Sequence, residues 1–280
     1  MNTNTNTITL APGHAPAAMP NRTRMVATAF LNLLWRDIWV TLREWPAFLA
    51  QTFMQPLFFL FIFGKVLPKI GAAQGGYSVL LLPGIIGLTT MLTAMQAVSL
   101  PLTLEFGFTK EIEDRLLSPL PVWMVAVQKM VFAAVRGLVA GVMIFPLGRL
   151  ILGGAFTVST GHLGLLALVA LLGALGGAAV GLTLGTFVQP SQIGLMFSLI
   201  LTPLLFTGCV YYPWSGLGTL RWFQVVTCFS PLTYASEGFR AALVPQTPHM
   251  GVGYMLLGQV FFLVLFTILG VRGFLRKAID

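Results

Sequence analysis

The sequence contains few charged residues. Asp, Glu, Lys and Arg make up 9% of its 280 residues, whereas a soluble domain carries roughly 25%. Hydrophobic residues make up 56% of the chain and the mean hydropathy is +0.87, so a soluble globular domain is excluded. The net charge of +8 comes from basic residues scattered between apolar segments. It therefore predicts cytoplasmic loops and contacts with membrane lipid, and no nucleic-acid partner.

Residues that bind metals or form disulfides are also scarce. The three histidines, His14, His162 and His249, have no second ligand at metal-site spacing, so no metal site is predicted. The two cysteines, Cys209 and Cys228, are expected near the outer face of a membrane, where an oxidising environment permits a disulfide. Both can equally be small apolar side chains, and the sequence leaves the two interpretations open.

Long apolar runs dominate what is present. Runs near the roughly 20 residues of a spanning helix lie at 46–63, 77–102, 122–147, 162–188, 192–211 and 251–271. They lack the alternating pattern of a membrane barrel. Because a backbone that crosses lipid must satisfy its own hydrogen bonds, the predicted fold is an all-α membrane protein with a six-span transmembrane domain over 46–272.

Basic residues on the two sides of these spans predict the orientation. With the N-terminus inside, nine basic residues are cytoplasmic: Arg22, Arg24, Arg36, Arg43, Lys110, Arg115, Arg272, Arg276 and Lys277. Five are outside: Lys65, Lys69, Arg149, Arg221 and Arg240. This excess favours a cytoplasmic-membrane protein with both termini in the cytoplasm.

The first 45 residues divide into two parts. Residues 1–24 lack the apolar run of a signal peptide and are expected to form a disordered, uncleaved cytoplasmic tail. At the other end, residues 273–280 are expected to form a short cytoplasmic tail. Residues 25–45 form an amphipathic pattern, with a charged face opposite an apolar arc. The arc contains Leu31, Leu34, Trp35, Ile38, Leu42 and Trp45. This pattern predicts a helix that lies in the membrane interface.

Acidic residues gather in the loop 103–121, within LPLTLEFGFTKEIEDRLLSPLPVW. Glu105, Glu111, Glu113 and Asp114 are half of the eight acids of the chain. Residues 110–117 can form two helical turns, in which Glu111 precedes Arg115 by four residues. The loop is predicted either to dock a cytoplasmic partner through this short helix or simply to be solvated.

The segment 212–250 is too apolar for a free loop but is interrupted by Pro213, Pro231, Pro245 and Pro248. Two short helices that dip into the outer leaflet would fit, with Glu237 and Arg240 paired along one helix face. The alternative is a seventh span over 217–243. Its charged residues and Pro231 weigh against it.

Two charged residues interrupt the third predicted span. Lys129 and Arg136 are seven residues apart and share one stripe of the helix. Lys129 is predicted to extend to the cytoplasmic surface and is, with Arg136, a candidate for a translocation path. Arg136 lies roughly 22 Å along the helix from Pro121, too deep to reach that surface. It is expected either to line the translocation path or a dimer interface, where it meets an anionic or polar substrate group, or to make a structural bond to helix carbonyls or a neighbouring span.

Small residues form a stripe in the fourth predicted span. Gly173, Gly177, Gly181 and Gly185 repeat every four residues on one helix face. Such a stripe allows another helix to approach closely. It is predicted to pack spans of one subunit together or to contribute to a dimer contact.

Together, these features resemble the permease subunit of type-2 ABC exporters. The resemblance rests on EIEDRLLSPLP after the second span and on FTGCVYYPWSGL followed by SPLTYASEGFRAAL. It implies a permease homodimer and a cytoplasmic ABC ATPase that contacts the loop helix and the interfacial helix. The coupling candidates are Glu111, Glu113, Asp114, Arg115, Arg36 and Arg43. The resemblance also implies an outer gate, with candidates Pro213, Trp214, Glu237 and Arg240.

A nucleotide site is not expected in this chain. The stretch GAAQGGYS at 71–78 has Tyr77 where a phosphate loop needs lysine. The chain is therefore predicted not to be an enzyme, and ATP and Mg are expected on the partner ATPase. The predicted function is export of an amphipathic or lipid-linked substrate such as a glycan, lipid or drug. The alternative is an autonomous secondary transporter or channel, although no span contains an obvious acidic ion site apart from Glu105 at the end of one.

Overall fold

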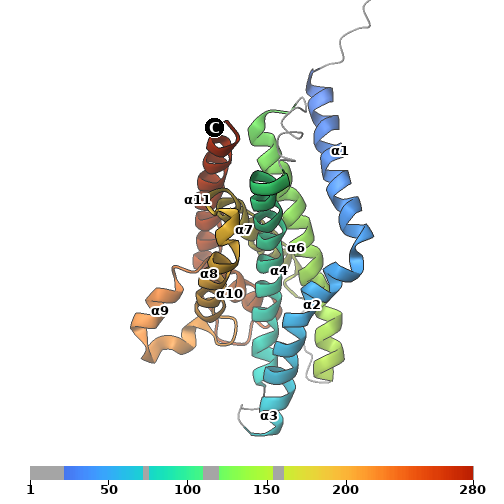
Figure 1. Ribbon diagram of the computed structural model, residues 1–280. Coiled ribbons are helices and arrows are strands. Elements are labelled where there is room, and N and C mark those ends of the chain that lie inside the picture. Colours follow the sequence, from blue (N-terminus) through green and yellow to red (C-terminus); the bar gives the residue numbers. More distant parts are fainter. Residues whose placement is uncertain (1–21, 72–75, 110–119, 154–160, 280) are drawn as a thin grey trace, which may run out of the picture.

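Figure 1 shows a computed structural model of the chain, which describes residues 22–71, 76–109, 120–153 and 161–279. In these ranges the regular structure is entirely helical, with no strand. The prediction of an all-α membrane protein is therefore confirmed. The long helices are α1 (Arg22–Arg43), α2 (Trp45–Phe61), α4 (Tyr77–Leu104), α6 (Val122–Leu152), α7 (Leu163–Phe187), α8 (Ile193–Thr207) and α11 (Val252–Ile279).

Six helical stretches of the described chain are long and apolar enough to cross a membrane. Five correspond to predicted spans: Trp45–Lys69, Tyr77–Gly107, Val122–Leu152, Leu163–Phe187 and Val252–Ala278. The sixth, Thr23–Arg43, is the helix predicted to lie in the interface. In place of the predicted span 192–211, the structure has α8 of 15 residues, or about 22 Å. That length is less than the roughly 30 Å hydrocarbon thickness.

Helix α4 lies at the centre of the bundle. In its most apolar 18-residue window 83% of the residues are buried, against 11% in that of α11. Four of its hydroxyl groups donate to carbonyls one turn earlier in the helix: Thr89, Thr90, Ser99 and Thr103, each at 2.8 Å. Helices α6, α7 and α10 (Pro231–Leu243) pack around it. These four hydroxyl groups can therefore be buried in the helix with their hydrogen bonds made.

The glycine stripe of α7 lies largely against α4. A Cβ added at Gly177 or Gly181 would overlap the carbonyl oxygen of Met91 or Met95, respectively. Gly185 faces Leu102, whereas Gly173 lies next to Ala235 of α10. The backbones of α4 and α7 therefore approach closely because these positions have no side chain.

The segment between α8 and α11 contains only short helices. These are the 3-10 helix η5 (Trp214–Thr219), α9 (Arg221–Thr227) and α10. The chain leaves helical geometry at Cys228 to Ser230 and begins α10 with Pro231 in its first turn. The alternative of a seventh span over 217–243 is therefore wrong, because the proline begins a new helix here and does not extend the previous one.

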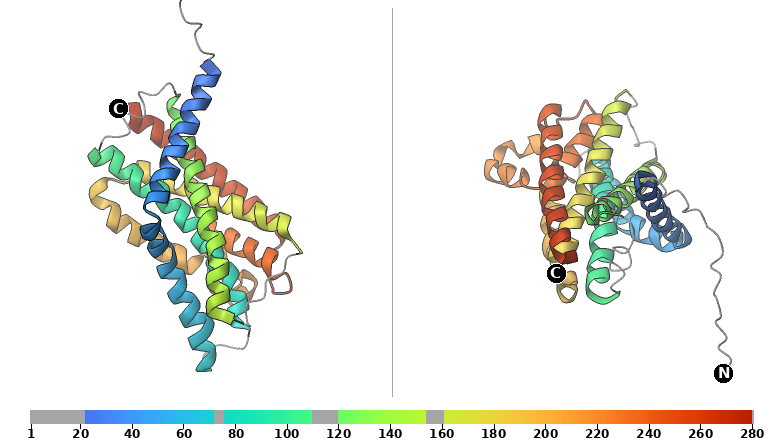
Figure 2. Two further views of the ribbon diagram at one scale, coloured as in Figure 1. Left: turned by 90° about the vertical axis from the view of Figure 1, so that its right-hand side faces the viewer. Right: turned by 90° about the horizontal axis from the view of Figure 1, so that it is seen from above.

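The two ends of the bundle are distinct in Figure 1. At the top are the N-terminal end of α1 and the C-terminal ends of α4 and α11. In the lower half are α3 (Leu67–Lys69), α9 and α10. Helix α1 packs beside α6. In the left view of Figure 2, α1 is steeply inclined to α11. The helix predicted to be interfacial thus departs from the direction of the central bundle.

Candidate functional site: a polar cavity beside the helix elbow

Helices α1 and α2 meet in an elbow at Glu44. Helix α1 ends at Arg43, and α2 begins at Trp45 with Pro46 in its first turn, where proline needs no amide hydrogen bond. Between this elbow, α4 and α6 lies a cavity of about 570 Å³. The lining residues are Arg36, Asp37, Val40, Thr41, Glu44, Ala47, Phe48, Gln51, Ala97, Pro101, Glu105, Lys129, Phe132 and Arg136.

A buried ion pair forms one wall of the cavity. The Nζ atom of Lys129 lies 2.7 Å from Oε1 and 2.6 Å from Oε2 of Glu105. Both side chains are less than a tenth exposed. The prediction that Lys129 extends to the cytoplasmic surface is therefore wrong. Helical structure continues past Pro101 into a π-helical turn, η2 (Glu105–Thr109), which places the carboxylate beside the ammonium group.

Helix α1 supplies another polar wall. The Nε2 group of Gln128 donates a hydrogen bond to Oδ2 of Asp37 at 3.0 Å, which joins α6 to α1. Asp37 also lies 3.6 Å from Nε of Arg36, an exposed residue. Arg43 does not line the cavity, and its guanidinium lies 6.0 Å from the Trp39 ring centroid. Of the two α1 arginines proposed for coupling, only Arg36 therefore reaches the cavity.

Arg136 projects into the cavity from α6. Its guanidinium lies 4.8 Å from the ring centroid of Phe48, within range of a cation–π interaction. Its Nε atom is buried and has no hydrogen-bond partner among the described residues. Arg136 also lines a second cavity of about 200 Å³, with Phe48, Gln51, Thr52, Thr93, Gln96, Ala97, Leu100 and Pro101. It is the only charged residue of that lining.

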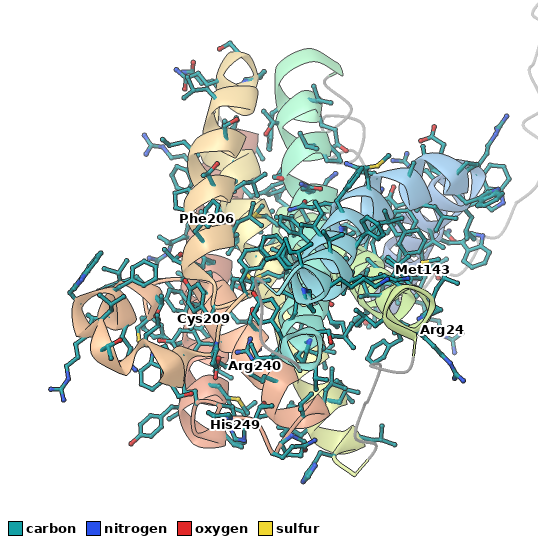
Figure 3. All side chains as sticks on the ribbon, turned by 90° about the horizontal axis from the view of Figure 1, so that it is seen from below. Arg24, Met143, Phe206, Cys209, Arg240 and His249 are labelled. Carbon is teal, nitrogen blue, oxygen red and sulfur yellow. The ribbon has the colours of Figure 1, made fainter. Side chains whose placement is uncertain are left out.

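A second polar centre lies near the opposite end of the bundle. Glu237 and Arg240 are fully buried and form the ion pair that their spacing predicted. Glu237 also accepts hydrogen bonds from the backbone amides of Trp214 (2.9 Å) and Met250 (2.7 Å). Arg240 donates to the carbonyl of Cys209 at 3.0 Å, and Figure 3 shows these two residues close together.

This network joins α10 to the segment that contains Cys209 and Trp214 on one side and to Met250 on the other. Burial lowers the pKa of the Arg240 guanidinium, and the Glu237 carboxylate opposes that shift. Pro213, which was also proposed for the outer gate, immediately precedes η5. Trp214 is tethered twice, since its Nε1 group donates to the carbonyl of Gln224 and its own carbonyl accepts from Gln224 Nε2. The hydrogen bonds of the Glu237–Arg240 ion pair therefore hold together the parts of the segment 208–250.

The four loop residues proposed for coupling, Glu111, Glu113, Asp114 and Arg115, lie outside the described residues.

Within the described ranges, no group of three His, Cys, Asp or Glu side chains could hold a metal ion. Cys209 and Cys228 are free thiols. The sequence did not indicate Glu105, Gln51 or Gln96 as site residues, because their proximity to Arg136 and Lys129 arises from packing between helices and not from local spacing.

Comparison with known proteins identifies the class. Residues 28–244 match the family model described as ABC-2 type transporter. The chain is 26% identical over 227 residues to the inner membrane transport permease YadH of Escherichia coli K12, covering 75% of this chain and 81% of that protein. The Shigella flexneri protein of the same name gives the same values. The chain therefore belongs to the ABC-2 type transporter family, and it is a multi-pass transmembrane permease subunit of an ABC transporter.

Proposed function

We propose that the protein is the permease of an exporter that moves an amphipathic or lipid-linked molecule out across the cytoplasmic membrane. The observation that carries this proposal is the polar cavity beside Arg136 in an otherwise apolar bundle. Ionisable groups within membrane spans are costly and commonly mark substrate pathways. Arg136 would contact the substrate, whereas Lys129 would act through its buried pair with Glu105. The inner membrane location stated for the YadH permeases supports this placement.

Energy would come from a separate ABC ATPase that binds ATP and Mg, while two copies of this permease form the transport path. Glu111, Glu113, Asp114 and Arg115 would dock the ATPase through the loop after α4. Arg36 and Arg43, on α1, would contribute to the same surface. Arg36 is exposed and borders the cavity, which supports a coupling role near the substrate path.

Helix α1 would lie in the membrane interface, with membrane lipid as its partner. Leu31, Trp35, Leu42 and Trp45 of the predicted apolar arc are 58–65% exposed. By contrast, Val26, Phe30 and Leu33 pack against the bundle. A helix that carries a large outward apolar surface with tryptophans is suited to the boundary between head groups and acyl chains.

The segment 208–250 would form the outer gate, with Pro213, Trp214, Glu237 and Arg240 as its principal residues. Its short helices α9 and α10 and its buried ion pair support this role. Because Glu237 bonds to segments before and after α10, breaking these bonds would release several segments together.

Co-purification tests the proposal. The tagged permease is isolated in mild detergent, and associated proteins are identified by mass spectrometry and assayed for ATP hydrolysis. We expect an ABC ATPase that is lost when Glu111, Glu113 and Asp114 are changed to Lys. The Arg221→Glu variant, which changes an exposed charge at the opposite end, should retain it.

A permease that carries no ATPase, yet transports solute alone in liposomes, would contradict the proposal. That result would favour an autonomous secondary transporter or channel.

A further inference from the structure

The smaller cavity contains an arginine whose bonding capacity is unused. A guanidinium has five N–H donors and no acceptor. The Phe48 ring can interact with the charge of Arg136, but it does not accept the in-plane Nε hydrogen bond. That Nε atom is buried without a partner among the described residues. Because Arg136 lines the cavity, it is the guanidinium as a whole, and not the enclosed Nε atom alone, that offers donors to a ligand there.

The other lining groups suit a small, oxygen-rich anion. Gln51, Gln96 and Thr93 face the same 200 Å³ space as Arg136 and have side-chain N–H or O–H donors. Hydrogen bonds from a charged donor to phosphate or carboxylate oxygens are about twice as strong as neutral ones. The small cavity has no acidic lining residue that would repel such a ligand.

The other cations that line the larger cavity are paired with carboxylates, whereas Arg136 is free to bind an anionic ligand. Lys129 is paired with Glu105, and Arg36 with Asp37. The remaining lining carboxylate, Glu44, is exposed at the elbow and forms no ion pair with Arg136. Solvent weakens the attraction between an exposed carboxylate and a partly buried cation. Among the cations that line this cavity, Arg136 is thus the one without a carboxylate within ion-pair distance in the described residues.

The position of Arg136 indicates what carries the anion. Arg136 is 14 residues after Val122, the first residue of α6, or about 21 Å along the helix. A free ion would lose its hydration to reach this depth. An amphiphile can bring its head group to this level while its chain contacts apolar walls such as Phe48, Leu100 and Ala97.

From these observations we infer that the small cavity binds the anionic head group, a phosphate monoester or a carboxylate, of an amphiphile. The inference rests on the proposed exporter function and specifies its substrate class. Arg136 bonds the anion, and Gln51, Gln96 and Thr93 hold its oxygens. The adjoining 570 Å³ cavity shares Phe48, Gln51, Ala97, Pro101 and Arg136 with the small one. The apolar chain lies along the apolar part of its lining, which includes Phe48, Ala97 and Phe132.

Equilibrium binding to the purified permease tests this site without the ATPase. Three probes share a ten-carbon chain: decyl phosphate, decyl trimethylammonium and decyl maltoside. We expect radiolabelled decyl phosphate to bind at least tenfold more tightly than the other two probes. The Arg136→Gln variant should weaken decyl phosphate binding roughly tenfold or more, as expected for loss of a charged hydrogen bond. The Arg149→Gln variant, exposed on the same helix, should leave it unchanged.

Two further arms complete the experiment. Inorganic phosphate should compete poorly, because it lacks the chain; equal competition by inorganic phosphate would overturn the amphiphile assignment. If Arg136→Gln does not fold, Gln96→Leu should still weaken decyl phosphate binding and spare decyl maltoside. Equal affinity for all three probes, or unchanged binding in both folded variants, would overturn the site. Since no ATPase takes part, these outcomes are independent of whether the partner co-purifies.

Discussion

At the scale of single residues, Glu237 bonds to three groups from different parts of the chain. Its carboxylate accepts from the amides of Trp214 and Met250 and pairs with Arg240. The i, i+3 spacing predicted the contact with Arg240, because that contact is local to one helix. The two amides come from segments 23 and 13 residues away, and no sequence pattern indicates them.

Removing this carboxylate should destabilise the protein. The Glu237→Ala variant leaves the Arg240 guanidinium buried and uncompensated, which typically costs about 3–5 kcal/mol. We expect a clear fall in the melting temperature measured in detergent. The double variant Glu237→Leu/Arg240→Met should recover part of this loss, because it removes both charges.

The exposed Glu44→Gln variant is the control and should change stability by less than about 0.5 kcal/mol. A Glu237→Ala protein as stable as the parent would mean that the pair contributes nothing to folding.

At the scale of elements, the contact between α4 and α7 depends on the absence of side chains. An alanine at Gly177 or Gly181 would place its Cβ on a carbonyl oxygen of α4. Each variant should lose about 1–3 kcal/mol, as is typical of overpacking. Gly176 lies on the same helix with open space around its missing Cβ, so Gly176→Ala should not destabilise the protein.

The measurement is the melting temperature of the Gly176→Ala, Gly177→Ala and Gly181→Ala variants in the same detergent. Equal melting temperatures for Gly176→Ala and Gly177→Ala would show that the two helices can separate without cost.

Hydropathy predicted most of the helices but not how two of them end. The apolar run 192–211 gave no sign that α8 ends at Thr207, where Cys209 then adopts a positive φ of 50°. Conversely, α4 continues beyond Pro101, and its π-helical extension brings Glu105 to Lys129. Apolar composition measures compatibility with lipid, whereas these endings depend on backbone geometry and on partners from other helices.

At the scale of the whole molecule, the two ends of the bundle should face different compartments. Basic residues predict that α1 and the C-terminus face the cytoplasm. In a chain with Cys209 and Cys228 replaced by Ala, cysteines are introduced singly at the exposed positions Arg24, Arg276 and Ser215. An impermeant thiol reagent should label Ser215→Cys in intact cells. It should label Arg24→Cys and Arg276→Cys only after permeabilisation.

The opposite labelling pattern would place the termini outside and reverse the assigned topology. Equal labelling at all three sites in intact cells would indicate leaky cells, so a cytosolic marker protein serves as the control.

The π-helical turn at Glu105–Thr109 has a consequence for how this part of the chain can change in evolution. Such a turn contains one more residue than an α-helical turn. Gly107, within it, lies so close to Pro190 that a Cβ would overlap the proline ring. Deleting one residue here would rotate the residues that follow by about 100°, which would break the close approach of Gly107 to Pro190. Relatives should therefore conserve the length of this turn and its glycine.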